Sequence, residues 1–298
     1  PPPGADWCGD GAPCRMWLVE TASGALSHIG EGERPHFAPR GDALAAHLSR
    51  DQPPTMREDA LAVPLLWPAP DGPPLTLGAA TPALWERAAW SADGRLLAAG
   101  HALATADGGT IEPLVDDEDT VANGISPDGG FVALAALTIV RSPEDDAGRK
   151  WTDLALLDRA SGARRAIWRS DEEPGHGHYW RLSQVAWSPD GTLLTFTGCG
   201  TALATDGTAS LKADARGCGV WVAAGDGSGL RLLPESAGAE RPLEDALPPR
   251  FAPDGTALLF VRWEGPPDET ARPSVWLWQA GAPAPTKVAD GSMPAWRP

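Results

Sequence analysis

The sequence predicts an all-β fold in which one strand-turn-strand unit recurs along the chain. A short motif, an aromatic or apolar residue followed by Ser/Ala-Pro-Asp-Gly and an apolar run, is found from the first fifty residues onward. The 34 glycines and 31 prolines supply many chain-reversing positions, and 42% of the residues are hydrophobic. This composition fits many short strands better than long helices.

The repeat occurs as five complete copies and one shorter copy. They span residues 36–46, 89–99, 124–134, 186–196, 250–260 and 294–298. The glycine shared by the complete copies falls at Gly41, Gly94, Gly129, Gly191 and Gly255. Because the intervals between these glycines are unequal, we infer a constant structural unit separated by connections of variable length.

Each complete copy predicts a β-hairpin. Proline presets the first turn position, aspartate tolerates the second, and glycine accepts the left-handed conformation that closes the turn. A second strand pair is expected downstream of most copies, as in residues 152–168, 219–234 and 274–289. Two such hairpins make one four-stranded antiparallel sheet, and several sheets arranged radially cover one another's faces.

Six copies predict a six-bladed β-propeller of four-stranded blades, with residues 1–298 as a single domain. The last copy reaches only Pro298, where its turn should begin, whereas residues 15–30 have the pattern of an outer strand pair without a motif hairpin before it. We therefore expect the N-terminal outer strands to pair with the C-terminal inner strand, with residues 1–7 as a candidate for the second strand of that blade. Such closure would tie down both termini.

The motif resembles the repeats of TolB-like propellers. The resemblance rests on WSPDG at residues 187–191, the apolar strand after it, and turns of the DxxSG type such as residues 158–162, and it covers nearly the whole chain. Similar repeats occur in TolB proteins, in the propeller domains of prolyl-oligopeptidase-like peptidases and in many exported proteins. We expect the chain to lack the N-terminal domain of TolB and any peptidase domain, so the family's peptidoglycan-lipoprotein partner is not carried over.

The charge of the chain restricts its partners. Lys and Arg total 24 against 40 Asp and Glu, which gives a formal net charge of −16. An acidic chain repels nucleic acid and anionic membrane surfaces and attracts basic partners or cations. No apolar run approaches the roughly 20 residues that span a bilayer, so no transmembrane segment is expected. The oligomeric state is left open.

The four cysteines fall into two local pairs. Cys8 and Cys14 flank one Gly-rich segment, and Cys199 and Cys218 flank another, without CxxC-type metal spacing. We expect a disulfide within each pair, the alternative being four free thiols in a cytosolic protein. Disulfides favour an oxidising compartment, so the sequence predicts an exported periplasmic or extracellular protein whose targeting segment is absent from this chain.

The aromatic residues of the motif could be mistaken for a binding site. Their positions are Phe37, Trp90, Ile125, Trp187, Phe251 and Trp296. Equivalent positions in every repeat most economically pack between blades, so we expect these side chains to fill the core. Binding residues are expected instead on the loops at the end of the propeller opposite the motif turns, because loops on a rigid scaffold commonly carry function.

Three groups of loop residues are candidate site residues. The acidic run Asp116, Asp117, Glu118 and Asp119 offers the oxygen ligands that calcium prefers, although such runs are usually solvated. His176 and His178 would share one face of a strand beside Asp171 and could hold zinc, or they could simply be exposed. Trp85, Tyr179 and Trp180 are candidate contacts for a partner or ligand. No other cofactor is expected.

The sequence contains no GxSxG elbow, no HExxH motif and no P-loop, so we do not expect an enzyme. The favoured function is a non-enzymatic, exported, protein-binding or scaffolding subunit of an envelope or extracellular assembly. One alternative is a metal-dependent propeller hydrolase or lyase with its site at the channel mouth. The other is a small-ligand or carbohydrate-binding module.

Overall fold

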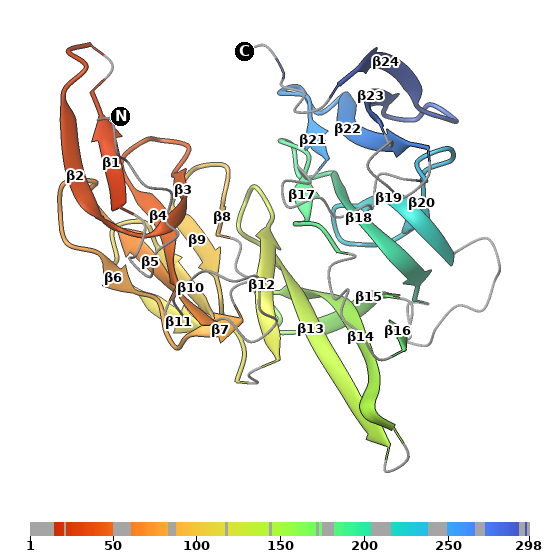
Figure 1. Cartoon of the computed structure of the whole chain (residues 1–298), viewed down its shortest axis with the longest axis horizontal. Coiled ribbons are helices and arrows are strands. Elements are labelled where there is room, and N and C mark those ends of the chain that lie inside the picture. Colours follow the sequence, from red (N-terminus) through yellow and green to blue (C-terminus); the bar gives the residue numbers. More distant parts are fainter. Residues whose placement is uncertain are drawn as a thin grey trace. The chain divides into compact units, whose positions relative to one another are not determined.

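A computed structural model of the chain confirms the all-β prediction (Figure 1). The structure describes residues 15–20, 22–49, 61–82, 88–116, 119–142, 145–170, 173–174, 182–203, 216–237, 249–265, 272–291 and 296. Within these ranges every strand pair is antiparallel and no helix occurs. It follows that no helix able to cross a membrane is present in the described part of the chain.

The chain divides into two compact units, Pro1–Asn123 and Gly124–Pro298, which are described separately. The first unit contains two sheets and one separate hairpin. The hairpin is β1 (Arg15–Val19) with β2 (Leu26–Glu31). Sheet 1 comprises β3 (Glu33–Phe37), β4 (Leu44–Ser49), β5 (Leu61–Trp67) and β6 (Leu75–Thr76), with β7 (Thr81–Pro82) paired to β5. Sheet 2 comprises β8 (Ala89–Trp90), β9 (Leu96–Ala99), β10 (Ala102–Thr105) and β11 (Ile111–Pro113).

The second unit contains three further sheets of the same strand order. Sheet 3 comprises β12 (Thr120–Ile125, which begins at the end of the first unit), β13 (Phe131–Ser142), β14 (Asp145–Asp158) and β15 (Arg164–Ser170), with β16 (Glu173–Pro174) paired to β14. Sheet 4 comprises β17 (Ala186–Trp187), β18 (Leu193–Ala202), β19 (Arg216–Ala224) and β20 (Arg231–Leu232). Sheet 5 comprises β21 (Arg250–Phe251), β22 (Ala257–Glu264), β23 (Arg272–Gln279) and β24 (Thr286–Asp290). Pairing of β15 with β18 joins sheets 3 and 4.

The five complete sequence repeats form the predicted hairpins. Equivalent pairs include His36 with Ala45, Ala89 with Ala98, and Arg250 with Leu259. All five shared glycines adopt the positive φ that closes the turn: Gly41 (74°), Gly94 (67°), Gly129 (72°), Gly191 (73°) and Gly255 (73°). The outer pairs expected at residues 15–30, 152–168, 219–234 and 274–289 are also present. Of the sixth copy only Trp296 is described, so the end-to-end closure lies outside the described residues.

The core lies between neighbouring sheets. Sheets 1 and 2 meet through small side chains, of which seven are alanines: Ala38, Ala43, Ala45, Ala88, Ala99, Ala102 and Ala104, with Leu66, Leu77 and Leu97 among them. Sheets 3 and 4 meet through large rings, since Trp168, Phe196 and Trp221 are fully buried and in mutual contact. The β1–β2 hairpin packs Met16 against Trp67 and Leu65 of sheet 1.

The aromatic positions of the repeat differ in burial. Ile125 is buried, whereas Trp90, Trp187, Phe251 and Trp296 are half-buried. Phe37 is 48% exposed, so the expectation that it fills the core is wrong for the described structure. The motif strand lies at the edge of its sheet, and the motif aromatics there are less enclosed than rings on interior strands. The fully buried rings lie on the second, third or fourth strand of a sheet: Trp67, Trp168, Phe196, Trp221, Phe260 and Trp278.

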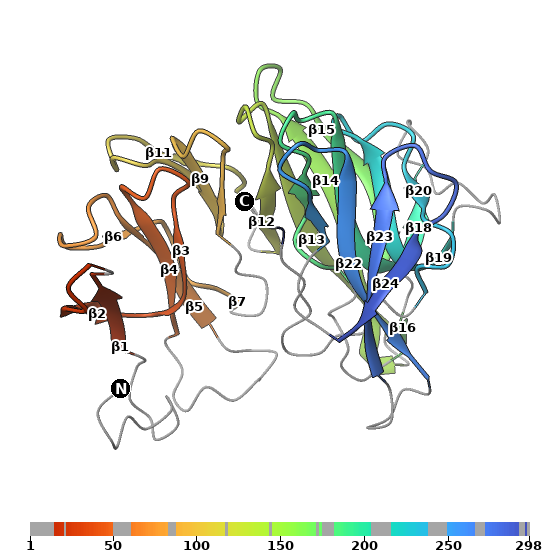
Figure 2. The same cartoon turned by 90° about the horizontal axis from the view of Figure 1, so that it is seen from above.

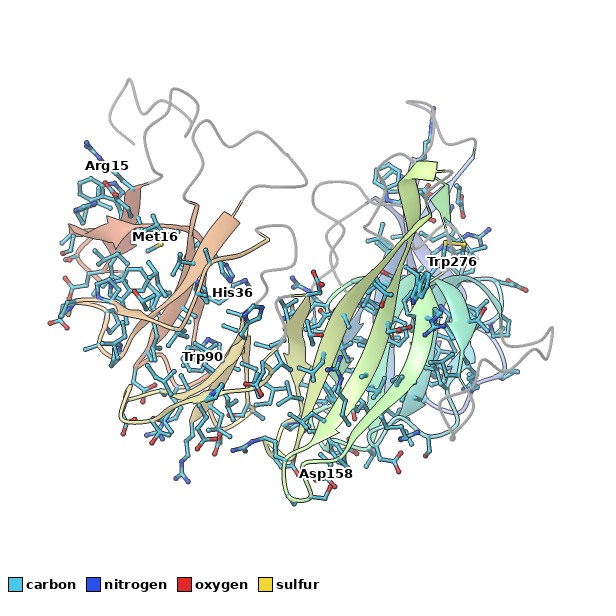
Figure 3. All side chains as sticks on the ribbon, turned by 90° about the horizontal axis from the view of Figure 1, so that it is seen from below. Arg15, Met16, His36, Trp90, Asp158 and Trp276 are labelled. Carbon is cyan, nitrogen blue, oxygen red and sulfur yellow. A yellow bond between two sulfur atoms is a disulfide. The ribbon has the colours of Figure 1, made fainter. Side chains whose placement is uncertain are left out.

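Two of the motif tryptophans make the same contact. The Trp90 indole donates a hydrogen bond to the His36 carbonyl of the preceding repeat at 3.2 Å (Figure 3). The Trp296 indole donates equivalently to the Arg250 carbonyl at 3.0 Å. Trp187 differs, because its indole donates to Gly225 in its own sheet at 2.9 Å. Trp90 in the first unit and Trp296 in the second therefore each link their repeat to the preceding one.

Candidate functional site

Each sheet has two ends that carry different connections (Figure 2). Antiparallel order places the motif turn and the turn between the two outer strands at one end, which we name the turn end. The connections between the second and third strands, and between sheets, fall at the opposite end, which we name the loop end. The sequence predicted binding at the loop end.

The motif turns are built on a repeated serine-aspartate pair. Ser91, Ser126 and Ser188 are buried and donate to Asp93, Asp128 and Asp190 at 2.7, 2.6 and 2.6 Å. Each serine Oγ also accepts the backbone N–H that begins the next strand, at Leu96, Phe131 and Leu193. These contacts give the Ser-x-Asp pattern a structural role, which is to hold the motif turn. The sequence analysis did not predict this role for the serine, although the serine recurs in the motif.

Hydrogen bonding lowers the pKa of these aspartates. For Asp128 and Asp190 the main cause is the serine hydroxyl, followed by a backbone N–H. For Asp93 the backbone N–H of Arg95 contributes most and Ser91 second. Asp254 has Ala252 where the others have serine, and its lowered pKa comes first from the Thr256 N–H. Donors that favour the ionised carboxylate explain all four shifts.

Neighbouring motif turns also contact one another. A Cβ placed on Gly94 would lie 3.3 Å from Cδ of Pro39 in the preceding turn. The corresponding distances are 3.7 Å from Gly191 to Pro127 and 3.6 Å from Gly255 to Pro189. The shared glycine therefore closes its own turn through positive φ, and only at Gly94 would an added Cβ be closer to the preceding turn than ordinary van der Waals contact.

A cavity of about 370 Å³ opens at the turn end of the first unit. Its walls come from the turns of sheets 1 and 2 and include Arg40, Asp42, Arg95 and Asp107. Arg40 and Arg95 pair with Asp42 and Asp93 at 3.4 and 3.6 Å, and all four side chains are more than half exposed. Because each cation already faces its own carboxylate in solvent, this cavity has no strong unsatisfied charge for a ligand.

Most residues predicted for the site lie outside the described part of the chain. This applies to Trp85, Asp117, Glu118, Asp171, His176, His178, Tyr179 and Trp180. Asp116 and Asp119 are described and exposed at the loop end of sheet 2. The described ranges contain no group of three or more residues able to ligate a metal. Calcium and zinc binding therefore stay predictions.

The loop end differs sharply between sheets. In sheet 2 the second and third strands are joined only by Gly100 and His101. In sheet 3 the corresponding strands β13 and β14 have 12 and 14 residues, in sheet 4 β18 and β19 have 10 and 9, and in sheet 5 β22 and β23 have 8 each. Three successive repeats of the second unit thus carry extended hairpins at this end. From the uneven spacing of the repeats, the sequence predicted only that the loops differ in length.

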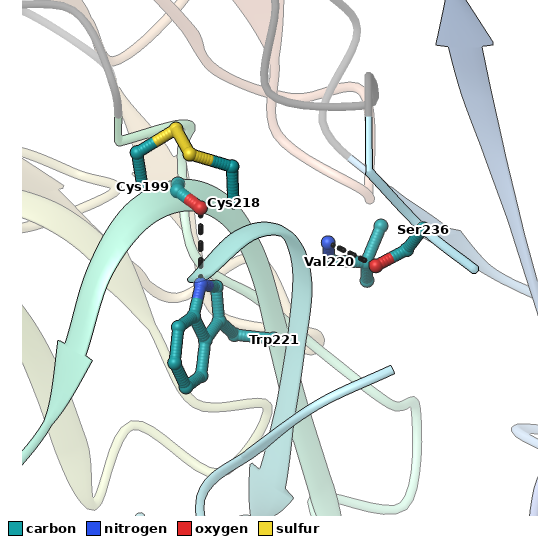
Figure 4. Close-up of a disulfide and its surroundings, with 6 residues drawn as sticks. Cys199, Cys218, Val220, Trp221 and Ser236 are labelled. Carbon is teal, nitrogen blue, oxygen red and sulfur yellow. Dashed lines mark hydrogen bonds between the residues drawn. A yellow bond between two sulfur atoms is a disulfide. The ribbon is translucent and has the colours of Figure 1, made fainter. Parts of the chain in front are cut away.

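A disulfide fastens the sheet 4 hairpin (Figure 4). Cys199 and Cys218 lie directly opposite in the β18–β19 register and are bonded at 2.04 Å, as predicted. The Cys8–Cys14 pair falls outside the described residues. The buried Trp221 indole donates to Gly198 O at 3.0 Å, next to the disulfide. Together these contacts hold the extension of the hairpin beyond the sheet.

Glycines on both sides of the disulfide permit close packing. A side chain at Gly200 would collide with Arg169 O and the Trp168 ring of sheet 3, and one at Gly219 would collide with Ser236. The Ser236 hydroxyl accepts from Val220 N at 2.9 Å and donates to Leu233 O at 2.7 Å. Glu235, before it, is the only described non-glycine residue with positive φ (57°), and its carbonyl accepts from Arg262 at 2.7 Å. The loop end of sheet 4 therefore contacts sheet 3 through Gly200 and sheet 5 through the Glu235 carbonyl.

Comparisons with known proteins give distant structural likenesses. No protein-family model and no curated protein matches the sequence. A solved structure assigned as TolB from Agrobacterium tumefaciens is similar with 18% identity over 93% of this chain and 89% of that chain, at a TM-score of 0.46. The β-propeller domain of the Trilobed protease from Pyrococcus furiosus is similar with 11% identity, 93% and 75% coverage, and a TM-score of 0.46. The periplasmic gluconolactonase of Pseudomonas aeruginosa has 13% identity, 93% and 91% coverage, and a TM-score of 0.36. At these values no family is assigned, so function rests on the repeat and the site geometry.

Proposed function

We propose that the six repeats form one closed, six-bladed propeller domain. The β1–β2 hairpin supports this proposal because its two faces differ. Met16 is buried on the face toward sheet 1 (Figure 3). Trp17, Val19 and Leu26 on the other face are 53%, 53% and 56% exposed. Three large apolar side chains on one hairpin face are unusual for a surface in water. In a closed ring this hairpin is the outer half of the sixth blade, and sheet 5 covers the exposed face.

The propeller acts as a non-enzymatic, protein-binding or scaffolding subunit. The observation that carries this proposal is the set of three extended hairpins at the loop end of sheets 3, 4 and 5. Projecting strand pairs offer broad surface and main-chain hydrogen-bonding groups, which suit a protein partner better than an enclosed small substrate. The motif aspartates and serines, which could otherwise be candidates for catalysis, are engaged in turn hydrogen bonds.

The site of action is an oxidising compartment, the periplasm or the exterior of the cell. Support comes from the Cys199–Cys218 disulfide, since such bonds persist where thiols are not kept reduced. The partner belongs to an envelope or extracellular assembly. Its surface is basic or neutral, because a chain of net charge −16 repels an acidic partner.

The proposal is tested by capture. The oxidised chain is immobilised and exposed to periplasmic and secreted proteins of its natural host, and retained proteins are quantified against the bait. We expect one protein retained near 1:1, equally by the wild type and by a turn-end control, Arg40→Ala with Arg95→Ala. Retention that the turn-end control abolishes, or the absence of any stoichiometric partner, would contradict a loop-end binding function.

A further inference from the structure

Asp–Gly pairs recur along the chain. Ten aspartates are followed by glycine, and eight of these pairs lie within the described residues. The eight aspartates are Asp71, Asp93, Asp107, Asp128, Asp190, Asp226, Asp254 and Asp290. Because glycine has no side chain to shield its backbone nitrogen, this nitrogen can attack the carboxyl of the preceding aspartate and form a cyclic imide. The local fold therefore decides which pairs react.

The eight pairs differ in how the aspartate carboxylate is held. The glycine N–H donates to a backbone carbonyl at 2.7–2.9 Å in every pair. In six pairs the carboxylate also accepts the backbone N–H two residues ahead, at 2.8–3.1 Å, from Arg95, Gly109, Gly130, Thr192, Ser228 and Thr256. The Asp290 carboxylate instead pairs with the Lys287 ammonium at 2.8 Å. Among the residues that the structure describes, the Asp71 carboxylate has neither kind of partner.

The residue two positions ahead explains why Asp71 differs. This residue is Pro73, which has no backbone N–H to donate. Ala69, two positions before Asp71, has no hydroxyl either. The same tripeptide, Pro-Asp-Gly, occurs at residues 70–72 and in the motif turns at 127–129, 189–191 and 253–255. The four copies thus form an internal comparison in which the tripeptide is constant and only its neighbours change.

The hydrogen bonds of the motif turns oppose imide formation in two ways. The reactive species is the protonated carboxyl, whereas hydroxyl and N–H donors stabilise the ionised form and hold the pKa of Asp128, Asp190 and Asp254 below its usual value. Movement of the carboxyl carbon toward the glycine nitrogen also breaks these contacts. Asp71 has no such contact to lose within the described residues, and it is exposed to water in the turn between β5 and β6.

The only asparagine of the chain, Asn123, also precedes a glycine. An Asn–Gly pair can form the same imide, with loss of ammonia in place of water. Asn123 lies within β12 and is only 6% exposed. Burial in a strand restricts both the entry of water and the chain movement that the reaction needs. We therefore expect Asn123 to react slowly in the folded chain.

We propose that Asp71–Gly72 is a site of spontaneous isoaspartate formation, and that the motif turns protect their own Asp–Gly pairs from this modification. The Gly72 nitrogen attacks Cγ of Asp71, a C–N bond forms, and the carboxyl OH and the amide proton leave as water. Water then opens the cyclic imide at either carbonyl. Opening at the original main-chain carbonyl breaks its bond to the nitrogen, so the chain continues through Cβ and Cγ and its backbone is longer by one carbon.

The modification should alter the turn end of the first unit. The turn that contains Asp71 joins β5 to β6, and β6 has only two residues to hold it in sheet 1. Pro68 and Leu75, at the two ends of this turn, lie against Gly108 of sheet 2, and Pro68 also lines the cavity at the turn end. A longer backbone here should loosen the contact between the turns of sheets 1 and 2 as the protein ages. The extended hairpins at the loop end of the second unit contain no part of this turn.

The test compares the four Pro-Asp-Gly copies within one molecule. The folded, full-length chain is incubated near neutral pH in water labelled with heavy oxygen. Mass spectrometry of its peptides then measures isoaspartate and label uptake at each aspartate, since passage through the imide incorporates one oxygen from water. We expect the rate at Asp71 to exceed the rates at Asp128, Asp190 and Asp254 by at least about fivefold, because each unit by which a pKa is lowered reduces the protonated fraction tenfold. In denaturant the four rates should converge.

Two variants test the cause of the difference. Ala69→Ser with Pro73→Thr reproduces the sequence of residues 188–192 and supplies the missing hydroxyl and N–H, so it should slow the reaction at Asp71 by about fivefold. Asp71→Glu is the control that should abolish the signal, because its longer side chain does not form the same ring. Equal rates at Asp71 and the three motif aspartates in the folded wild type would overturn the proposal, whether or not the double variant folds. A folded double variant that reacts as fast as the wild type would overturn the protective role of the turn contacts.

Discussion

The interface between sheets 1 and 2 and the interface between sheets 3 and 4 come from the same repeat and are packed with opposite kinds of side chain. The first is dominated by alanines, with Leu66, Leu77 and Leu97. The second contains Trp168, Phe196 and Trp221, each fully buried. A buried tryptophan removes far more apolar area from water than an alanine, on the order of 150–250 Å². The repeat therefore specifies strand order and turns, whereas each interface sets its own packing and its own response to mutation.

The largest expected effect is at the tryptophan-rich interface. Trp221→Ala removes a ring that contacts Phe196 and Trp168 and deletes the hydrogen bond to Gly198 O. We expect the free energy of unfolding of the second unit to fall by about 3–5 kcal/mol. Denaturant unfolding followed by hydrogen exchange of each unit measures the loss, and Trp221→Phe is the milder control. A loss below about 1 kcal/mol would show that this interface is not a major stabilising element.

The second largest loss of stability is expected on removal of the disulfide of sheet 4. Replacing Cys199 and Cys218 by serine opens a loop of sequence separation 19. The chain-entropy argument predicts a loss of about 3 kcal/mol. Thermal unfolding with and without reductant checks it, because reductant should lower the melting temperature of the wild type by more than that of the double variant, in which only the predicted Cys8–Cys14 bond is left to reduce. A wild type insensitive to reductant would refute the contribution of this bond.

The alanine-rich interface should respond to added volume. Ala99 is 1% exposed between sheets 1 and 2, so Ala99→Leu forces the neighbouring side chains apart. We expect a cost of about 1–3 kcal/mol confined to the first unit. Ala25→Leu, at an exposed turn, is the matched control and should be near neutral. Equal stability of both variants would mean that the alanines do not set the spacing of these sheets.

The serine of the motif turn should contribute less. Ser188→Ala leaves the Leu193 N–H without its hydroxyl acceptor and removes one of the two hydroxyls that donate to Asp190, the Thr192 hydroxyl being the other, at a cost of about 1 kcal/mol. Sheet 5 already carries Ala252 at this position and supplies the reciprocal variant, Ala252→Ser, which should stabilise by a smaller amount. Chemical denaturation of both variants compares them. Destabilisation by Ala252→Ser would show that the serine is specific to sheets 2, 3 and 4.

The smallest effect expected from any single group is the loss of stability in acid. This acid sensitivity should differ between the two units. Nine described carboxyls have a lowered pKa, of which only Asp93 and Asp107 lie in the first unit. Those in the second unit are Asp128, Asp158, Asp190, Asp226, Asp254, Glu264 and Asp290. A carboxyl whose pKa is lower in the folded state than in the unfolded state stabilises the fold. This contribution is complete above the unfolded pKa, about 4, and is lost as the pH falls further.

Acid should therefore unfold the second unit first. Pepsin cleavage sites mapped between pH 5 and 2.5 should appear in residues 124–298 before residues 1–123. The paired variants Asp128→Asn and Asp190→Asn should reduce the pH dependence. Earlier cleavage of the first unit would contradict the assignment of these carboxylates as the source of acid sensitivity.

The sequence predicted the repeated scaffold better than the site because the two are encoded differently. Turn chemistry is local, so Pro-Asp-Gly sufficed to place the hairpins around Gly129, Gly191 and Gly255. Burial is a tertiary property, and the motif pattern therefore did not reveal that Phe37 is exposed while Trp168 and Trp221 form the core. Long-range features such as the pairing of β15 with β18 could not be predicted from the sequence either, since this pairing depends on glycines such as Gly200 that let the two strands approach closely. The candidate site residues His176 and His178 are not part of the repeat, so the repeat gives no prediction of where they lie.

Closure of the six repeats into a ring is the central claim, and a photo-cross-link from the N-terminal hairpin tests it directly. Trp17→p-benzoylphenylalanine places the reactive group on the hairpin face whose apolar side chains are exposed within the first unit. On irradiation of the monomeric chain, we predict an intramolecular cross-link to residues 250–298, identified by mass spectrometry. Cross-links found only within residues 1–123, or only between separate molecules, would contradict the closed propeller.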